Sequence, residues 1–210
     1  RDGLFYIIDS SGELIAITDK AFAEAETVVI ADSGTKAALE FPDGSNIIYD
    51  LVTGEQTTLP NHWEDFEFSD DGEEVANKSI SIDPNTNALI ISSSDGSQTQ
   101  VVAGLGNNAD EVTVNMSPNN QVVAFSDTGQ TQSGFGRDEI YLIDLDGEAI
   151  GSLIVEGGNF SAIWSLTGSA ILYSVSLASA GDTPSLWYTN ATGSIGSERE
   201  RIDLQTWVEK

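Results

Sequence analysis

The sequence contains no cysteine, one histidine and few basic residues, and each shortage removes a class of function. Without cysteine the chain has no disulfide, no thiolate nucleophile and no cysteine-ligated zinc. Only 8 Lys and Arg residues stand against 34 Asp and Glu, a formal charge of -26, so the surface repels nucleic-acid phosphates and anionic lipid. No apolar run reaches the roughly 18 to 20 residues that cross a bilayer. We therefore expect no nucleic-acid partner and no direct membrane insertion by this segment.

What the sequence does contain is a repeated pattern of short strands and tight turns. The stretch 111–155 predicts four antiparallel strands, separated by Ser117-Pro118-Asn119-Asn120, by a loop rich in small polar residues, and by Asp146-Gly147. Similar four-strand units are predicted at 27–59, 64–103 and 160–204. Residues 1–18 supply one hairpin around Ser10-Ser11-Gly12, which looks like the second half of such a unit.

The spacing of the units predicts the fold class. Ser69, Ser117 and Ser165 each follow the aromatic or Met residue that ends a first strand, and they recur at intervals of 48 residues. A period of about 40 to 50 residues with four strands per unit is typical of a β-propeller. A β-sandwich also has many short strands but no reason to repeat its turn chemistry at a fixed interval. We predict an all-β chain, a single β-propeller domain or propeller fragment with about four and a half blades.

Two motifs carry a family resemblance. The segment M-S-P-N-N-Q-V-V-A-F at 116–125, followed by E-I-Y-L-I-D-L-D-G at 139–147, resembles the TolB-type, WD-repeat-like (PD40-like) propeller unit, whose pattern is roughly F-S-P-D-G-x-x-I-A-F and then I-Y-x-x-D-x-x-G. F-S-D-D-G at 68–72 is similar to its opening with Asp in place of Pro, and W-S-L-T-G at 164–168 is similar more loosely. The ending I-D-L-Q-T-W-V-E-K at 202–210 resembles a junction in bacterial cell-surface propellers. The resemblance is specific for fold and implies little about function.

Five complete blades would need two more strands than the predicted units contain. The missing two are the first and second strands of the blade to which the hairpin at 1–18 belongs. One interpretation is a fragment of a ring of about six to eight blades, whose missing strands lie upstream in a longer protein. The other is early closure with an incomplete first blade. Because open strand edges invite pairing, self-association through the propeller edges is expected for a fragment.

The sequence offers no recognisable catalytic constellation. A nucleophile-histidine-acid triad would have to use His62, and no G-x-S-x-G elbow supplies the serine. A sialidase-like propeller needs converging arginines, whereas Arg1 is terminal and Arg199 and Arg201 share one predicted strand. Nothing in the spacing of the 34 acidic residues selects a glycosidase pair. We predict that the chain is not an enzyme.

No cofactor is predicted, and calcium is the cation that the acidic turns would suit best. Calcium takes six to eight oxygen ligands, which two turns could begin to supply. They are D-L-D-G-E, with Asp144, Asp146 and Glu148, and S-D-D-G-E-E, with Asp70, Asp71 and Glu73. Neither has the regular oxygen spacing of an EF-hand, and acidic hairpin turns commonly serve as turns alone.

The candidate binding face is formed by the longer loops. Loops that join second to third strands, and those that join successive blades, lie on one side of a propeller, where ligands commonly bind. Here they span 59–65, 104–111, 127–138 and 155–160. The candidate ligand contacts in them are His62, Trp63, Phe135 and Arg137, with Asn107 and Asn108 as polar neighbours. The alternative is an ordinary loop in which Trp63 covers a blade edge.

Two classes of function remain open. The first is a non-catalytic binding or scaffold propeller that holds a protein or glycan at the cell surface. The second follows from the family resemblance, because similar propellers precede the hydrolase domain in prolyl-oligopeptidase-like peptidases and filter substrate access. The low Lys and Arg content favours an extracellular, periplasmic or cell-surface location, while an acidic cytosolic protein of a halophile would have a similar composition.

Overall fold

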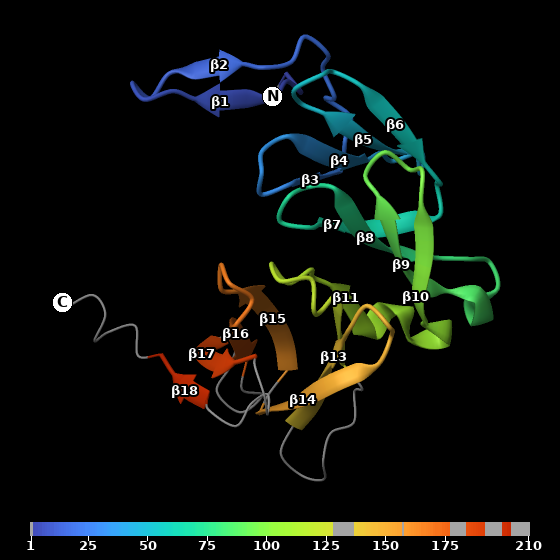
Figure 1. The fold of residues 1–210 in the computed structure, drawn as a ribbon, viewed down its shortest axis with the longest axis vertical. Helices are drawn as coiled ribbons and strands as arrows, with labels where there is room; N and C mark the ends of the chain where they lie inside the picture. Colours follow the sequence, from blue (N-terminus) through green and yellow to red (C-terminus); the bar gives the residue numbers. More distant parts are fainter. Residues whose placement is uncertain (1, 128–136, 157, 177–183, 192–198, 203–210) are drawn as a thin grey trace. The chain divides into compact units, whose positions relative to one another are not determined.

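The computed structural model describes residues 2–127, 137–156, 158–176, 184–191 and 199–202, which are mainly antiparallel strands (Figure 1). The chain divides into two compact units, residues 1–107 and 108–210. Within the described ranges, no helix has the length and apolarity that crossing a membrane would require.

The first unit contains one hairpin and two four-stranded sheets. The hairpin pairs β1 (Tyr6–Ile8) with β2 (Leu14–Ala16). The first sheet has the order β3 (Thr27–Ile30), β4 (Lys36–Glu40), β5 (Asn46–Asp50) and β6 (Gln56–Leu59). The second has the order β7 (Trp63–Phe68), β8 (Glu74–Ser79), β9 (Ala88–Ser93) and β10 (Thr99–Gly104), with the short 3-10 helix η1 (Pro84–Thr86) between β8 and β9.

The second unit contains two more four-stranded sheets. One has the order β11 (Val112–Val114), β12 (Ala124–Asp127), β13 (Arg137–Ile143) and β14 (Ala149–Glu156). The other has the order β15 (Gly158–Trp164), β16 (Ala170–Ser176), β17 (Pro184–Asn190) and β18 (Arg199–Arg201). The 3-10 helix η2 (Gly106–Glu111) crosses the boundary between the units. The predicted repeat of four-stranded antiparallel sheets and the predicted N-terminal hairpin are therefore confirmed.

The serines that mark the repeat build the turn between the first and second strands of a sheet. The hydroxyl of Ser69 donates to Asp71 Oδ1 (2.7 Å) and accepts from the backbone N–H of Glu74 (3.0 Å). Gly72 closes this turn with a left-handed backbone, φ +74°, which a residue without a Cβ adopts most easily. Ser117 makes the equivalent two hydrogen bonds in the next sheet along the chain. The motif is thus a self-contained hydrogen-bonded turn.

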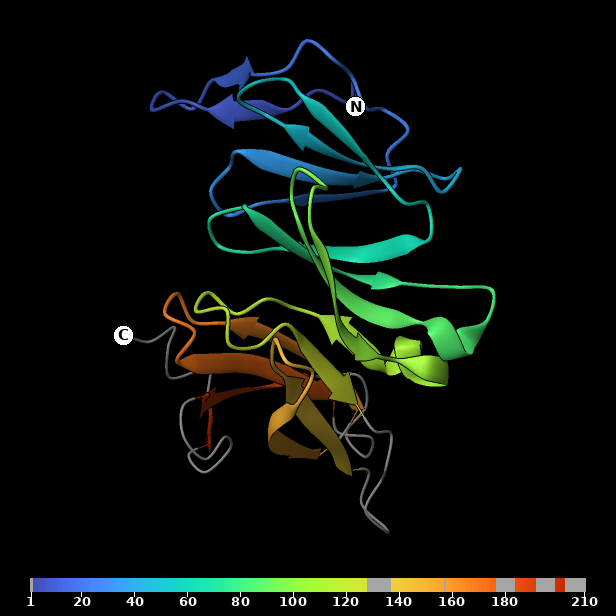
Figure 2. The ribbon, with the colours of Figure 1, turned by 45° about the vertical axis from the view of Figure 1, so that its right-hand side comes forward.

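Apolar side chains fill the space between the sheets of each unit. In the first unit, the sheets β3–β6 and β7–β10 lie face to face (Figure 2) and share one core, to which β7 contributes Trp63, Phe66 and Phe68. On the other face of β3–β6, Phe22 packs with Tyr49 and with side chains that flank the hairpin. In the second unit, the core between the two sheets is built from Val122, Phe125, Ile140, Leu142, Leu153, Val155, Ile171, Tyr173 and Val175.

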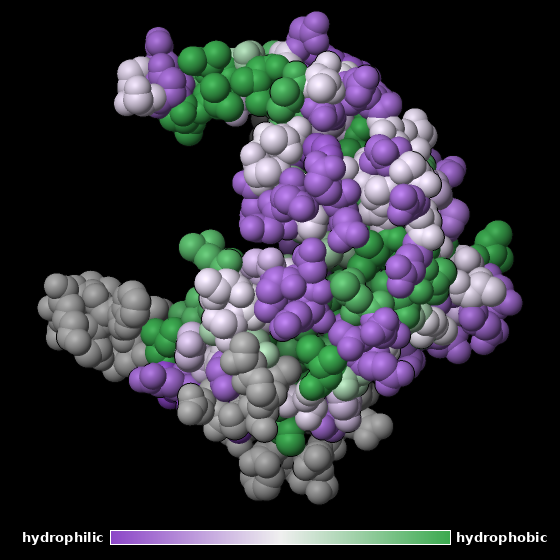
Figure 3. Space-filling model, viewed as in Figure 1, coloured by the Kyte–Doolittle hydropathy of each residue, from purple (hydrophilic) through white to green (hydrophobic). Residues whose placement is uncertain are grey.

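The hairpin β1–β2 differs from the sheets because the side chains of both its strands are exposed. Hydrophobic surface covers it in the space-filling view (Figure 3). The flanking residues Phe5, Phe22 and Ala25 attach it to the sheet β3–β6 through the second core of this unit.

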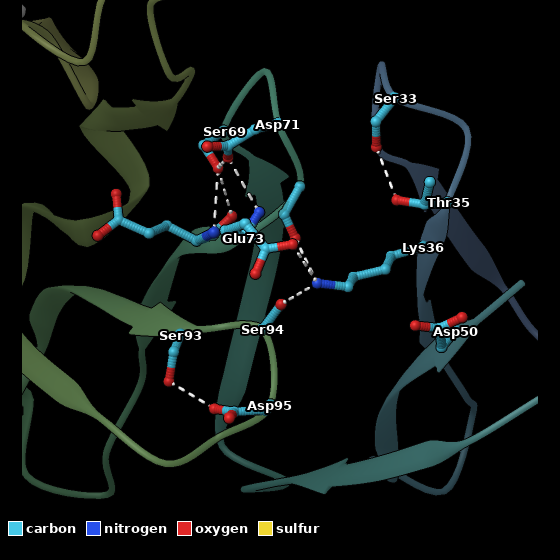
Figure 4. A network of polar contacts seen from close by, with 12 residues as sticks. Ser33, Thr35, Lys36, Asp50, Ser69, Asp71, Glu73, Ser93, Ser94 and Asp95 are labelled. Carbon is cyan, nitrogen blue, oxygen red and sulfur yellow. Dashed lines mark hydrogen bonds and ion pairs between the residues drawn. The ribbon is translucent and has the colours of Figure 1, made fainter. Parts of the chain in front are cut away.

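A largely buried cation joins the two sheets of the first unit. Lys36 begins β4, and its side chain, 16% exposed, extends toward the neighbouring sheet (Figure 4). Its Nζ donates to Ser94 Oγ (2.7 Å) and to the carbonyl oxygen of Gly72 (3.1 Å), and lies 3.1 Å from Glu73 Oε1. Because burial disfavours a cation that has no partners, this set of acceptors is what permits a lysine here.

Candidate functional site

The loops at one end of the sheet β7–β10 form the candidate site. We call it the long-loop end; it consists of residues 60–62 before β7, 80–87 between β8 and β9, and 105–107 after β10. The backbone N–H of Ile80 donates to the carbonyl of His62 (2.7 Å), and that of Leu105 donates to the carbonyl of Asn87 (2.8 Å). These bonds hold the three segments at the same end of one sheet.

Asn87 fixes the loop between β8 and β9. Its side chain is buried, and Oδ1 accepts from the backbone N–H of Ser81 (2.8 Å) while Nδ2 donates to the carbonyl of Gly106 (3.0 Å). Within the same loop, Asp83 Oδ1 accepts from the backbone N–H of Asn85 at the start of η1 (3.1 Å). The loop is therefore held by side-chain hydrogen bonds at both of its ends, so little conformational entropy would be lost when a partner binds it.

This fixed loop presents a fully exposed aliphatic side chain. Ile82 has a relative exposure of 106%, the highest of the exposed large hydrophobic residues in the described ranges. His62 and Asn107, which lie at the same end of the sheet, are also exposed. A single exposed isoleucine is common on protein surfaces, but one carried on a preorganised loop provides a ready apolar contact. Sequence reasoning missed Ile82, because nothing in the sequence identifies Asn87 as the residue that fixes the loop.

The structure brings together part of the predicted contact set. His62 lies before the first strand of the sheet and Asn107 after its fourth, so the two share the long-loop end but flank opposite edges of the sheet. Asn108 is exposed and belongs to the second unit. Phe135 lies outside the described residues. Arg137 is the first residue of β13, and its side chain is likewise outside the description.

The placement of Trp63 in a connecting loop was wrong. Trp63 is the first residue of β7, is 7% exposed, and belongs to the core shared by the two sheets of the first unit. Its carbonyl accepts a hydrogen bond from Asn46 Nδ2 (2.6 Å) in the neighbouring sheet. The sequence pattern misplaced Trp63 because β7 contains a β-bulge between Glu64 and Glu67. There Asp65 has a positive φ of 56° and the strand register shifts, which interrupts the alternation of apolar residues. Trp63 is therefore a packing residue, as the alternative held, but it lies within a strand and not in a loop.

The acidic turns use their carboxylates to hold the turns themselves. Asp71 accepts from the backbone N–H of Glu73 and from the Ser69 hydroxyl, and these bonds lower its pKa. Asp144 accepts from two backbone N–H groups of its own turn, those of Asp146 and Glu148. In the part of the chain that the structure describes, no group of three or more histidine or acidic side chains could hold a metal ion. The prediction of no cofactor, with calcium as the cation that these turns would suit best, is not tested by these contacts.

The most perturbed carboxyl group in the first unit is that of Glu67 on β7. Burial raises the pKa of Glu67 to about 7, and the nearby negative charge of Asp32 adds to the shift. A carboxyl group with this pKa is partly protonated at neutral pH, unlike an ordinary surface glutamate. It lies within a strand of the sheet rather than in the long-loop end, so we treat it as a determinant of stability.

Solved structures with a similar arrangement of sheets decide the fold. TolB from Acinetobacter baumannii aligns with 90% of this chain and 47% of its own length at 16% identity and a TM-score of 0.60. The chain has a β-propeller fold. Acylaminoacyl peptidase from Pyrococcus horikoshii aligns with 87% of the chain and 32% of its own length (14% identity, TM-score 0.61). The β-propeller domain of the Trilobed protease from Pyrococcus furiosus aligns with 85% of this chain and 58% of its own length (11% identity, TM-score 0.55).

These similarities confirm the predicted TolB-type propeller architecture and show the fold alone, because the identities are low. The chain spans less than two thirds of the length of each of these three proteins. No protein-family model and no curated protein sequence matches the chain. Because propellers of one architecture serve unrelated functions, the fold does not define what this chain binds or does.

Proposed function

We propose that the chain is a non-catalytic, extracytoplasmic binding propeller that holds a protein partner at the long-loop end of the sheet β7–β10. The observation that carries this proposal is the full exposure of Ile82 on a loop fixed by the hydrogen bonds of Asn87. An aliphatic side chain of this kind suits a small apolar pocket on a protein, whereas glycans are held more often by aromatic faces and hydrogen-bonding groups. The low basic content supports a location outside the cytoplasm.

Charge narrows the class of partner. Each chain carries a formal charge of -26, so encounter is fastest with a protein whose docking surface is basic. The exposed polar residues His62 and Asn107 would lie at the rim of the contact, with Ile82 as its apolar anchor. Binding should therefore weaken as salt rises, through slower association.

The test is site-specific photo-crosslinking followed by affinity measurement. A photo-crosslinking amino acid is placed at position 82 and, as the control, at position 166, and each protein is exposed to a cell-envelope extract. Leu166 is a matched control because it is 94% exposed but lies in the tight turn between the first and second strands of its sheet. We expect one protein to be crosslinked from position 82 and not from position 166.

Purified partner then permits a quantitative comparison. Ile82→Asp should weaken binding about tenfold or more, because burying an isoleucine contributes about 1.5 to 3 kcal/mol. Leu166→Asp should leave affinity unchanged, and both variants should unfold at the wild-type temperature. Equal loss of affinity in the two variants, or none in Ile82→Asp, would remove the long-loop end as the binding site.

A substrate-gating propeller of a larger hydrolase is the second candidate. It is supported by the similarity to the P. horikoshii peptidase, of which the chain matches only 32%. The coding sequence on either side of residues 1–210 distinguishes the two. An α/β-hydrolase segment in the same reading frame would favour the gating function, and further blades with a surface anchor would favour the binding module.

A further inference from the structure

The sheet β7–β10 directs two polar side chains into the core that it shares with the sheet β3–β6. Asn77 on β8 lies opposite Ile90 of β9. Ser92 on β9 lies opposite Val75 of β8. Residues that are directly opposite on paired strands have their side chains on the same face of the sheet. Both of these apolar partners belong to the core between the two sheets, so Asn77 and Ser92 point into it as well.

Both side chains are buried, and each has a polar atom that is unpaired. Asn77 is 0% exposed and Ser92 is 2% exposed. Asn77 Nδ2 donates to the carbonyl of Lys78 (3.3 Å). Asn77 Oδ1 and Ser92 Oγ have no hydrogen-bond partner among the described residues. Because an unpaired buried oxygen is unfavourable, such groups in folded proteins are generally satisfied by ordered water when no protein group reaches them.

The facing sheet restricts what the partner of these two oxygens can be. It contributes Ala31, Ala38 and Ile48 to this core, and their side chains contain neither a donor nor an acceptor. The buried residues of the core are at most 9% exposed, so only a small molecule fits among them. An ion is disfavoured, because its desolvation in an apolar core is costly. A small, neutral molecule that forms hydrogen bonds is what remains.

The strand register places the two oxygens at a separation that one water molecule can bridge. Asn77 and Ser92 are diagonal neighbours on adjacent strands, because each lies two residues away from the partner of the other. Diagonal neighbours have Cα atoms about 7 to 8 Å apart. A water that bonds to both oxygens spans about 5 to 6 Å, which is twice an ordinary O···O hydrogen bond. The two side chains cover the rest of the distance.

Polar groups also connect this position to the rim of the sheets. Ser94 follows Ser92 by two residues, and its hydroxyl accepts from Nζ of Lys36, a residue of the facing sheet (2.7 Å; Figure 4). The exposure falls from 4% at Ser94 to 2% at Ser92 and 0% at Asn77. A water molecule that enters beside Lys36 therefore meets hydroxyl groups along its way to Asn77.

We propose that one water molecule is bound between the sheets β3–β6 and β7–β10, where it bridges Asn77 Oδ1 and Ser92 Oγ. Water fits these groups because it is neutral and small, and because it donates to the amide oxygen while it bonds to the hydroxyl. This site lies within the packing of the first unit and away from the long-loop end, so the inference goes beyond the proposed function.

Cross-relaxation between water and protein protons, measured by NMR on the whole chain, tests the site directly. With asparagine labelled by nitrogen-15, the side-chain amide protons of Asn77 should show a nuclear Overhauser effect to water, with the sign of a water that tumbles with the protein. Asn46 is the control. It is also buried, at 3% exposure, but its Nδ2 donates to the carbonyls of Trp63 (2.6 Å) and Pro60 (3.3 Å), so it should show no such effect. Absence of the effect at Asn77 would overturn the proposal.

Two serine variants then identify the second partner of the water. Ser92→Ala removes one of its two hydrogen bonds and should greatly reduce the effect at Asn77. Ser94→Ala is the matched control, because Ser94 is similarly buried but its hydroxyl bonds to Lys36. It should leave the effect at Asn77 unchanged. An unchanged effect in Ser92→Ala, or an equal loss in both variants, would show that Ser92 does not hold the water.

Urea unfolding of Asn77→Leu, Ser92→Ala and the double variant is an independent test. With a bridging water, each single change leaves the other oxygen with a poorly held water, so each should lower the urea midpoint. The double variant should then lose less than the sum of the two, because neither oxygen is left. Without the water, each change removes an unsatisfied polar group, so the midpoint would rise in each variant and the effects would add. That second outcome would contradict the proposal.

Discussion

Replacement of Glu67 by glutamine should change how the stability of the protein depends on pH. Burial raises the pKa of Glu67 from 4.5 to about 7, so between these values the folded protein binds a proton that the unfolded chain releases. The free energy of unfolding therefore falls as pH rises from about 4.5, and the loss is complete above about pH 8. A shift of this size corresponds to about 3 kcal/mol. Glu67→Gln has no charge to desolvate and avoids this loss.

The assay is urea unfolding of both proteins at fixed ionic strength across this pH range. The variant should be more stable than the wild type by about 2 to 3 kcal/mol at pH 8 and similar to it at pH 4. Glu74→Gln serves as the control, since Glu74 is an exposed residue of the adjacent strand and its replacement should change stability little at any pH. A difference between Glu67→Gln and the wild type that stays constant with pH would refute the reasoning, because the effect would then come from packing.

The contacts between sheets in the first unit give two further predictions. Lys36→Met should lower the free energy of unfolding by about 1 to 3 kcal/mol, because the Gly72 carbonyl and the Ser94 hydroxyl lose their partner; an unchanged urea midpoint would mean that water replaces the ammonium at no cost. Gly72→Ala should be more destabilising than Gly34→Ala in thermal unfolding. Both glycines have a positive φ, but a Cβ at Gly72 would lie 3.1 Å from Ala31 Cβ and one at Gly34 would have no neighbour within 4 Å, so equal shifts would show that the sheets separate easily.

The parts of the fold that depend on local chemistry could be predicted from the sequence. Turns built on Ser69 and Ser117 contain their own donors and acceptors within six residues, so their sequence signature is complete. The alternation of apolar residues located the strands between these turns, and the period of the turns indicated the propeller. The N-terminal hairpin was predicted for the same reason, because its turn at Ser10-Ser11-Gly12 is also a local signature.

Features that depend on distant residues could not be predicted. The bulge at Asp65 interrupts the alternation of β7, so strict period-two counting from Phe66 and Phe68 places Trp63 on the wrong face. Nothing in the sequence around Lys36 predicts that its side chain donates a hydrogen bond to Ser94, which is 58 residues away. Likewise, Asn87 resembles any other loop asparagine until the loop closes around it, and so Ile82 was not among the predicted contacts.

The order of strands within the sheets has a consequence for how the chain folds. In each described sheet, every strand pairs with the strand that precedes or follows it in sequence, so each sheet can form from contacts of short sequence separation. Such contacts form early and fast, since little loop entropy opposes them. The link from Lys36 to Ser94 closes a much longer loop and should form after the rate-limiting barrier. Weakening that link should accelerate unfolding while leaving the folding rate nearly unchanged.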